Sequence, residues 1–439
     1  MLKRKFTDIL LNWKNNKSKE CLLVKGARQI GKTFIIEDFG KRYYKSYIYI
    51  NFFKNPEAKE IFSGSLEPDE IYKKISIYIK NVKFIENDTL IFLDEIQECP
   101  QARTALKFLA IDDKYDIIAS GSLLGINYKD IASIPVGYEY QIEMHSLDFE
   151  EFLWAKGMDS NAIEYIKSFF DKKQAVPNGI NEKMFQHLRE YMVVGGMPEV
   201  VNTYIATNNF NEVQKSQDKI LSDYLNDIAK YAEMKERPKV RNCYLSIPRQ
   251  LAKENKKFMF SVVEAKGRAR KYANSIEWLR DANLIRVCNN VSAPLFPLLA
   301  HEKTDQYKIY LNDIGLLVSM YGFDMKRAIL QNSLIGDTKG GIYENLIADI
   351  LIKKGIKLNY YKNDNSTQKI EFLITKDANV IPIEVKAGNN HTISLDNYIY
   401  NYKPKYAYKF INGNLGVADN KITLPLYMVM FLENNDIII

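Results

Sequence analysis

Cysteine and histidine are scarce in this sequence, which has four of each among its 439 residues. The cysteines form no CxxC pair, and no histidine accompanies them at the spacing of metal ligands; they are Cys21, Cys99, Cys243 and Cys288. Their scatter argues against both a disulfide framework and a structural zinc site. Thiols beside apolar runs are usually reduced and buried, so we expect a protein of a reducing compartment, the cytoplasm.

Long apolar runs are also missing. One of the longest, PLYMVMFL at 425–432, has eight residues, whereas a membrane-spanning helix needs about 20. The segment MLKRKFTDILLNWKNNK at the amino terminus has basic residues but no sustained apolar stretch, so we expect neither a membrane span nor a secretory signal. With 46% hydrophobic and 26% charged residues, the composition is that of a globular protein. The length allows about two to four domains.

Positive charge is concentrated in one part of the chain. From Lys230 to Arg286, fifteen Lys and Arg residues stand against six Asp and Glu, although the whole chain carries a net charge of only +7. The remaining residues therefore sum to a small negative charge. An anionic partner is expected to bind in the middle of the chain.

The first 145 residues alternate short apolar runs with longer stretches of helical periodicity. The runs are CLLVK (21–25), SYIYINF (46–52), TLIFLDE (89–95), YDIIASGS (115–122) and YEYQIEM (138–144). Continuous apolar strands separated by helices predict a parallel sheet covered on both faces. The chain then reads as helical to about residue 300, and its last part returns to α/β alternation. There a helix is expected from about Gly341 to Lys354, with strands at 357–361, 369–375, 380–386 and 424–432.

The segment GARQIGKT after the first run matches G-x-x-x-x-G-K-[ST], the phosphate-binding loop or Walker A motif. Its residues are the predicted nucleotide-binding set: Gly26, Ala27, Arg28, Gln29, Ile30, Gly31, Lys32 and Thr33. Glycines let backbone N–H groups point at the phosphates, and the following helix adds its positive N-terminal end. We expect Lys32 to reach the β- and γ-phosphates and Thr33 to bind Mg²⁺. The motif therefore predicts a P-loop NTPase that binds Mg-ATP.

Two further runs end in polar residues at the same predicted edge of the sheet. TLIFLDE ends in Asp94 and Glu95, as a Walker B motif does at the carboxyl edge where ligands bind. We expect Asp94 to hold Mg²⁺ through its water shell and Glu95 to polarise the attacking water. The alternative is a solvated acidic pair. YDIIASGS ends in Ser120 and Ser122, and Ser122 is the candidate catalytic sensor of the γ-phosphate, although ordinary turn chemistry explains these serines almost as well.

Four segments together resemble the prokaryotic AAA-type ATPases that carry a C-terminal nuclease-like domain of unknown function: GARQIGKT, FLDEIQECP, ASGSLLG and MHSLDFEEFL. The resemblance extends over nearly the whole chain and implies ATP hydrolysis. In related signal-transduction ATPases a G-x-P motif in the helical lid contacts the base, and Gly196 and Pro198 match it here. A helix stop followed by a rigid turn explains these two residues equally well.

The resemblance leaves the source of an arginine finger open. Many relatives have an arginine after the glycine that follows the sensor strand, whereas this chain has Tyr138 there. Arg28 and Arg103 are the remaining candidates for stabilising charge on the phosphates.

The basic middle of the chain, from Pro238 to Val291, resembles a winged helix. Four basic residues crowd the beginning of its second helix: Lys266, Arg268, Arg270 and Lys271. A recognition helix presents this end to DNA, and positive side chains there oppose the helix dipole. We therefore interpret the four as DNA-binding residues. A solvated basic face and a protein-binding surface stay open as alternatives.

The last domain has the acidic residues of a nuclease-like site. Glu344 lies early on a predicted helix, Glu371 on a strand, and Glu384 and Lys386 on the next strand. Residues i and i+2 of a strand face the same side, so a carboxylate and an ammonium project together, as metal-dependent phosphodiester cleavage requires. The arrangement resembles the PD-(D/E)xK nuclease superfamily, with Glu384-Val385-Lys386 as its E-x-K. That family usually has aspartate in place of Glu371, so binding of a second Mg²⁺ or Mn²⁺ is expected more than cleavage, and a degenerate scaffold is the alternative.

The predicted fold class is α/β, with four parts: a P-loop AAA-type ATPase core with a parallel sheet (1–145), a helical lid (146–230), a basic winged-helix-like region (231–304) and an α/β restriction-nuclease-like domain (305–439). The preferred function is a Mg-dependent ATPase coupled to DNA binding or processing. The alternative is a nucleotide-dependent signalling switch whose C-terminal regions bind a protein and whose nuclease fold is inactive. A nucleotide kinase is disfavoured because no arginine-rich acceptor lid is visible. Expected ligands are ATP and Mg²⁺, the expected partner is DNA or a protein but no membrane, and a homo-oligomer is left open.

Overall fold

The computed structural model describes residues 2–16, 20–122, 137–363, 365, 368–386 and 393–433. The chain divides into two compact units. The N-terminal unit comprises Arg4–Ser146 with Asp281–Asn283, and the C-terminal unit comprises Leu147–Arg280 and Leu284–Ile438 with Met1–Lys3. Among the helices of the described ranges, none is long and apolar enough to cross a membrane.

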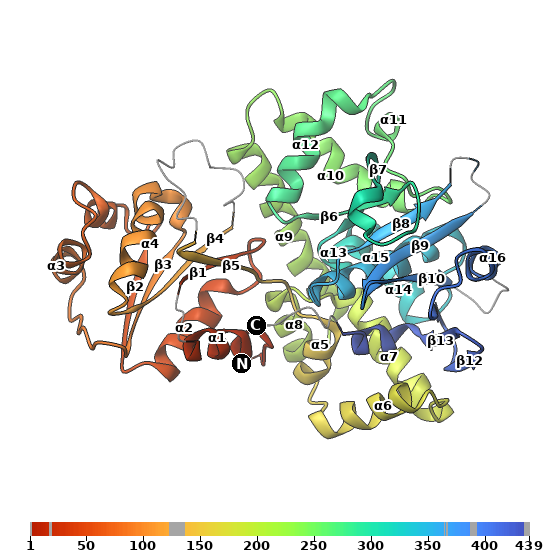
Figure 1. Ribbon diagram of the computed structural model, residues 1–439. Helices are drawn as coiled ribbons and strands as arrows, with labels where there is room; N and C mark the ends of the chain where they lie inside the picture. The colour runs from red at the N-terminus through yellow and green to blue at the C-terminus, as the bar shows by residue number, and fades with distance from the viewer. Residues whose placement is uncertain are drawn as a thin grey trace. The chain divides into compact units, whose positions relative to one another are not determined.

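Five parallel strands form the sheet of the N-terminal unit, in the order β2-β3-β4-β1-β5 (Figure 1). They are β1 (Cys21–Lys25), β2 (Ser46–Asn51), β3 (Thr89–Asp94), β4 (Asp116–Gly121) and β5 (Glu139–Glu143). The five apolar runs of the sequence thus become the five strands, and the predicted parallel sheet is confirmed. Because β1 pairs with β4 on one side and β5 on the other, the loop after β1 emerges from an interior strand at the sheet's carboxyl edge.

Helices connect these strands and cover the sheet on both faces. They are α1 (Phe6–Asn15), α2 (Lys32–Tyr43), α3 (Pro68–Tyr78) and α4 (Pro100–Asp112), with the 3₁₀ helices η1 (Pro56–Phe62) and η2 (Ile96–Glu98). Proline occupies the first position of η1, α3 and α4, where its missing N–H and fixed φ favour the start of a helix.

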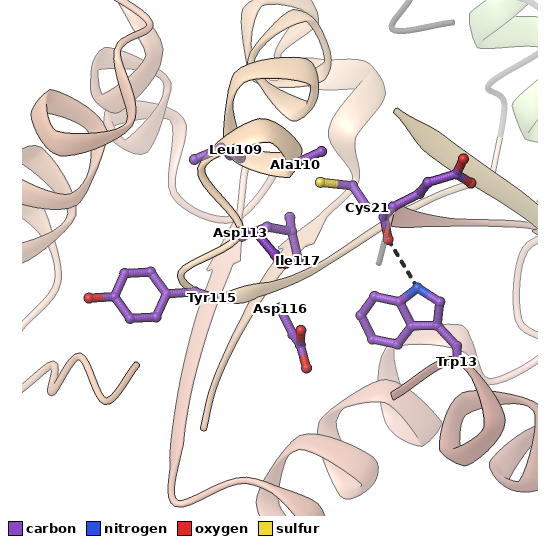
Figure 2. Close-up of a pocket in the computed structure, with 9 residues that line it drawn as sticks. Trp13, Cys21, Leu109, Ala110, Asp113, Tyr115, Asp116 and Ile117 are labelled. Atoms are coloured by element: carbon purple, nitrogen blue, oxygen red, sulfur yellow. Dashed lines mark hydrogen bonds between the residues drawn. The ribbon is translucent and has the colours of Figure 1, made fainter. Parts of the chain in front are cut away.

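A small cavity lies at the amino ends of β1 and β4, away from the loop that follows β1 (Figure 2). Its volume is about 10 Å³, and Trp13, Cys21 and Asp116 are among the residues that line it. The Trp13 indole N–H donates to the Glu20 carbonyl over 3.0 Å. A space of this size holds about one water molecule, so the cavity is far too small for a nucleotide.

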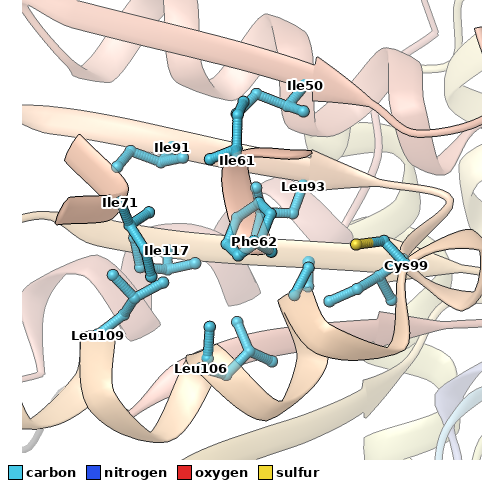
Figure 3. Close-up of a cluster of buried hydrophobic side chains, with 14 of the residues drawn as sticks. Ile50, Ile61, Phe62, Ile71, Ile91, Leu93, Cys99, Leu106, Leu109 and Ile117 are labelled. Carbon is cyan, nitrogen blue, oxygen red and sulfur yellow. The ribbon is translucent and has the colours of Figure 1, made fainter. Parts of the chain in front are cut away.

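Alternate residues of the strands form a core with η1, α3 and α4 (Figure 3). Ile50 of β2 and Leu93 of β3 are fully buried in this core, together with Phe62 of η1 and Leu106 of α4. The intervening strand residues, such as Leu90, face α2, where Gly40 lets the helix approach the sheet closely. Both faces of the inner strands β1, β3 and β4 are therefore buried, which is why their sequences are apolar without alternation, whereas the edge strand β5 is largely exposed.

The C-terminal unit begins with a long helical part. Its helices are α5 (Phe149–Ala155), α6 (Ser160–Lys172), α7 (Asn178–Val194), α8 (Pro198–Thr207), α9 (Phe210–Tyr231), α10 (Arg237–Leu251), α11 (Phe260–Val263) and α12 (Ala269–Asp281). The segment MHSLDFEEFL forms a capping box at the start of α5: the Asp148 carboxylate accepts from the Glu151 N–H over 2.9 Å, and the Glu151 carboxylate accepts from the Asp148 N–H over 3.0 Å.

An eight-stranded mixed sheet completes the C-terminal unit, in the order β12-β13-β11-β10-β9-β8-β6-β7. Its strands are β6 (Ile285–Val291), β7 (Glu302–Leu311), β8 (Asn359–Lys362), β9 (Lys369–Lys376), β10 (Asn379–Lys386), β11 (Ala407–Ile411), β12 (Gly416–Ala418) and β13 (Lys421–Pro425). The further helices of the C-terminal unit are η4 (Leu298–His301), α13 (Ile314–Met320), α14 (Phe323–Leu330), α15 (Gly336–Lys353), α16 (Ile393–Tyr402) and η5 (Leu426–Phe431). The hairpin β6–β7, which follows α12, is part of this sheet because β6 pairs with β8. The predicted boundary at 304/305 consequently falls inside β7.

The terminal apolar run at 424–432 is not the strand that its sequence predicts. β13 ends at Pro425, and the following residues form η5, whose side chains are all buried. A short, continuously apolar run has no periodicity that separates a buried strand from a buried helix. Pro425, the residue before η5, has no N–H to donate, so it cannot continue the hydrogen-bond ladder of the strand.

Candidate nucleotide site

The loop between β1 and α2 has the backbone of a phosphate-binding loop. Gly26 and Gly31 have φ values of 149° and 90°, which residues other than glycine rarely adopt. A Cβ atom on Gly26 would lie 2.3 Å from the Met144 carbonyl oxygen, so no other residue fits there. The local sequence therefore dictates the loop, and α2 begins directly after it at Lys32.

The Lys32 ammonium is buried within this loop. It donates to the carbonyl oxygens of Gly26 and Ala27, each over 2.8 Å. Burial lowers the pKa of Lys32 to about 8, although the Glu95 and Asp94 carboxylates act in the opposite direction. The side chain thus lies inside the phosphate-binding loop, as the sequence predicts, with its charge only partly compensated.

Asp94 is the centre of the hydrogen-bond network at the carboxyl edge of the sheet. Its Oδ2 accepts from the Thr33 hydroxyl over 3.0 Å, which joins the Walker A helix to the Walker B strand. Its Oδ1 accepts from the Ser120 hydroxyl and from the Glu95 N–H. The parallel register brings Asp94 and Ser120 side by side on β3 and β4. The structure therefore brings Thr33, Asp94 and Ser120 together.

Two residues of β2 that were not predicted from the sequence also bind Asp94. The Tyr49 hydroxyl and the Asn51 amide each donate to Asp94 Oδ2 over 2.9 Å. Asn51 pairs in register with Asp94. The signal for Asn51 was present, because it is a polar residue at the end of a predicted strand on the same edge of the sheet.

Glu95 and Gln97 form a pair beside Asp94. Glu95 has a left-handed backbone, with φ 55°, which directs its side chain away from the direction of β3 and is uncommon for a residue other than glycine. The Gln97 amide donates to the Glu95 carboxylate, and Gln97 was not singled out in the sequence. Left-handed residues of this kind are concentrated at functional sites.

Ser120 in β4 and Ser122 just after this strand have different partners. Ser120 binds Asp94, whereas the Ser122 hydroxyl accepts from Arg28 Nε over 3.2 Å. Arg28 of the phosphate-binding loop therefore lies against the predicted sensor residue. Arg103 is 2% exposed and forms an ion pair of 2.9 Å with Glu139 on β5, so its described contacts are with the sheet.

Arg4 joins the start of the chain to the phosphate-binding loop. Its guanidinium donates to the Ile30 carbonyl over 3.2 Å and to the His145 carbonyl over 2.7 Å. Nothing in the local sequence marked Arg4, because these contacts join segments far apart in the chain.

Gly196 and Pro198 lie in the C-terminal unit, in the turn between α7 and α8. The Gly196 N–H donates to Asp313 Oδ2 over 2.8 Å, and its carbonyl accepts from the Leu147 N–H over 2.7 Å. A Cβ atom on Gly196 would lie 1.9 Å from the Leu147 carbonyl oxygen. These contacts give the glycine a packing role of its own, and the contact with a nucleotide base stays a prediction.

The basic residues at the start of α12 are exposed. Lys266, Arg268 and Arg270 all lie at the surface, while Lys271 forms an ion pair of 2.5 Å with Glu264. The helices α10, α11 and α12 precede the hairpin β6–β7, which belongs to the eight-stranded sheet, and the winged-helix interpretation stays a prediction.

The predicted nuclease-like residues meet in the C-terminal unit, but lysines accompany them. The acid–lysine cluster comprises Lys256, Lys308, Glu344, Lys369, Glu371, Glu384 and Lys386. Its three glutamates are at most 3% exposed. Burial opposes ionisation of Glu344, yet Lys308 and Lys256 hold the pKa of this carboxyl well below its usual range. Among the described residues no group of three or more His, Cys, Asp or Glu side chains is placed to hold a metal ion, and Lys256, Lys308 and Lys369 were not predicted.

Glu371 and Glu384 behave as a coupled pair. Burial and the neighbouring Glu371 carboxylate raise the pKa of Glu384 well above its usual range. Burial acts on Glu371 too, but the hydrogen bond from Glu384 and the charges of Lys369 and Lys386 lower its pKa to about 2. With both groups ionised, their Oε2 atoms have no hydrogen-bond partner among the described residues. A proton held by Glu384 would let this carboxyl donate to the Glu371 carboxylate.

The strand order, the loop after β1 and the Thr33–Asp94 contact define a P-loop NTPase. Residues 18–153 match the family model described as "AAA domain", so the N-terminal unit contains an AAA-type P-loop ATPase domain. Residues 185–327 and 339–429 match two models described as domains of unknown function, DUF8612 and DUF4143. No curated protein sequence matches this chain.

Solved structures of similar proteins include a Walker-type ATPase of Pyrococcus abyssi. It is 15% identical, with a TM-score of 0.43, and the match covers 73% of this chain and 96% of that one. The Aeropyrum pernix Orc1 protein in complex with DNA is 12% identical, with a TM-score of 0.30 and coverage of 75% and 90%. AMPPCP-bound DnaA from Aquifex aeolicus is 14% identical, with a TM-score of 0.29 and coverage of 62% and 86%. Similarity at this level does not indicate a shared function.

Proposed function

We propose that this protein is a Mg-dependent, AAA-type ATPase whose ATP turnover is coupled to DNA. The observation that carries the ATPase part is the meeting of Thr33 and Ser120 on Asp94, next to the phosphate-binding loop. It joins the Walker A helix, the Walker B strand and the predicted sensor strand at one carboxylate. Such an edge of a parallel sheet is where nucleotides bind.

The residues present suit the phosphates and the metal of Mg-ATP. Loop N–H groups and the Lys32 ammonium would bind the phosphates. The Thr33 hydroxyl and the Asp94 carboxylate are the hard oxygen ligands that Mg²⁺ prefers, and they already lie 3.0 Å apart. Bound Mg²⁺ would neutralise charge on the β- and γ-phosphates. Glu95 would polarise the attacking water, with Gln97 holding one of its carboxylate oxygens.

Two features of the C-terminal unit support the coupling to DNA. Lys266, Arg268 and Arg270 are exposed at the start of α12, where a recognition helix contacts a duplex. The helix order and the hairpin β6–β7 agree with the proposed winged-helix region. The helical segment 146–230 would serve as the lid, with Gly196 and Pro198 toward the base.

A second candidate function rests on the acid–lysine cluster. Because lysines neutralise Glu344, the nuclease-like domain is suited to binding rather than cleavage. A nucleotide-dependent switch with a protein partner would use the same ATPase site and need no DNA.

The test is the rate of ATP hydrolysis with and without duplex DNA. We expect the duplex to raise turnover, and replacement of the four basic residues by glutamine to abolish this stimulation. That variant should also reduce the slope of log K against log salt by about 0.9 for each phosphate that the protein no longer neutralises. The matched control replaces four exposed lysines elsewhere in the unit, which removes the same charge: Lys172, Lys183, Lys215 and Lys219. Turnover that ignores DNA, together with an unchanged salt slope, would favour the protein-partner switch.

A further inference from the structure

The Glu344 carboxylate, on α15, is surrounded by positive charge. Lys256 Nζ lies 3.0 Å from its Oε1, and Lys308 Nζ lies 3.0 Å from its Oε2. The Tyr310 hydroxyl also donates to Oε2, over 3.2 Å. The side chains are almost completely buried: Lys256 is 6% exposed, Lys308 2% and Glu344 3%. Both oxygens of this carboxylate therefore have strong donors.

The two strand carboxylates share a third lysine. Lys386 Nζ lies 2.8 Å from Glu384 Oε1 and 3.6 Å from Glu371 Oε1. Lys369 Nζ lies 3.4 Å from the same Glu371 oxygen. An ammonium group thus lies between the two carboxylates on the strands.

A divalent cation does not fit this arrangement. Mg²⁺ and Mn²⁺ need several oxygen ligands free to approach closely, and carboxylates that still carry uncompensated negative charge. The described part of the cluster has four lysines and three glutamates, so its formal charge is already positive. No group of three or more His, Cys, Asp or Glu residues in the described ranges is placed to hold a metal ion.

We propose that the buried ammonium groups of Lys256 and Lys308 replace the divalent cation of a nuclease-like centre. The centre is then neutralised by the chain itself and neither binds metal nor cleaves phosphodiesters. This inference deepens the proposed function, on which it rests for the role of the C-terminal unit: that unit binds its partner and leaves it intact. The replacement is reversible in principle, because removing one ammonium group exposes a carboxylate that a cation can then bind.

The experiment is a titration of the full chain with Mn²⁺ in the absence of nucleotide. Free Mn²⁺ is measured by electron paramagnetic resonance, and the melting temperature is followed in parallel. Mn²⁺ at the ATPase site is distinguished from Mn²⁺ at the acid–lysine cluster by the variant Glu384→Ala. This variant removes a carboxylate of the cluster only, so Mn²⁺ at the ATPase site persists in it. We expect the parent protein and Glu384→Ala to bind Mn²⁺ equally, and the parent not to nick supercoiled plasmid with Mg²⁺ or Mn²⁺.

The decisive measurement is the gain in Mn²⁺ affinity of a variant that lacks one buried lysine. Lys308→Met should raise Mn²⁺ affinity by at least about tenfold, since one buried positive charge beside Glu344 is removed. The gain should disappear when Glu344→Gln is added. Lys256→Met is the second variant, with the same expectation at the less buried lysine. Lys339→Met is the matched control, because Lys339 lies on the same helix beside Tyr343 and not beside Glu344.

Two results would overturn the inference. One is Mn²⁺ binding or plasmid nicking by the parent protein that Glu384→Ala abolishes. The other is a folded Lys308→Met or Lys256→Met protein with unchanged Mn²⁺ affinity. Neither result depends on DNA-stimulated ATP turnover, so this inference and the proposed ATPase coupling fail separately.

Discussion

At the scale of single residues, the site depends on how burial changes the charge of Lys32. The ammonium lies among the carbonyl oxygens of its own loop, and desolvation lowers its pKa to about 8. A phosphate bonds the protonated form only. The protonation state of this one side chain therefore sets how much nucleotide the loop binds once the pH approaches and exceeds about 8.

The affinity for ATP should fall as the pH rises above about 8. Lys32 has a lower pKa in the nucleotide-free protein than beside a bound phosphate. At pH values between these two pKa values, each rise of one pH unit should weaken ATP binding by up to about tenfold. Calorimetric titration with a non-hydrolysable ATP analogue from pH 7 to 9.5 measures this. Lys32→Arg is the control: arginine stays charged, so its affinity should be weaker but flat over this range. An equally flat profile in the parent would contradict the buried-lysine explanation.

Glu95 should matter for hydrolysis and little for binding. Glu95→Gln is expected to retain ATP and to slow hydrolysis by about two orders of magnitude or more, a loss of about 3 kcal/mol of transition-state stabilisation. Single-turnover kinetics with labelled ATP separates the two effects. Glu98→Gln is the matched control, because Glu98 lies close by at the end of η2 and pairs with Lys59. A parent-like rate in Glu95→Gln would assign the water to another residue.

At the scale of elements, Gly195 and Gly315 let the turn after α7 lie against the beginning of α13. Asp313 caps α13 through the N–H groups of Gly315 and Leu316, and it accepts the Gly196 N–H with its other oxygen. A Cβ atom on Gly315 would lie 2.4 Å from the Val194 carbonyl oxygen. Close backbone packing accounts for the glycines here.

Gly196→Ala should destabilise the C-terminal unit by about 1–3 kcal/mol, because the new methyl group must displace the Leu147 backbone. Urea unfolding of the full chain measures the change. Gly179→Ala is the control, since a Cβ atom on Gly179 meets nothing within 4 Å and alanine favours the helix. An unchanged stability in Gly196→Ala, with weakened ATP binding, would instead support the base-contacting role.

At the scale of the whole molecule, the proposal requires coupling between two ligands. Binding free energies are linked reciprocally, so a duplex that raises ATP affinity by some factor must gain the same factor in its own affinity when ATP is bound. Glu95→Gln lets both affinities be measured without hydrolysis. We expect equal factors of about 5 to 150 in the two titrations. If neither ligand changes the affinity of the other, ATP and DNA bind independently. The alternative function, a switch with a protein partner, permits that result.

The sequence by itself determined the features that neighbours along the chain create. The glycines of 26–31 and Lys32 and Thr33 act within one turn, so the motif sufficed to predict the loop. The continuous apolar runs at 21–25, 89–95 and 115–122 likewise predicted buried parallel strands, and the end of the second placed Asp94 at the carboxyl edge of the sheet. The short run at 424–432 could not be predicted, because its apolar residues have no period that separates a strand from a 3₁₀ helix.

Only the tertiary structure decided which distant side chains share a site. Tyr49 and Asn51 reach Asp94 because β2 pairs with β3 in one particular register. Lys256 and Lys308 reach Glu344 because a loop, a strand and a helix pack around it. Charge compensation in a buried cluster depends on distances of about 3 Å between segments far apart in the chain, and no local pattern encodes them. The acidic residues could therefore be predicted from their helix and strands, and Lys386 from its strand, while Lys256, Lys308 and Lys369 could not.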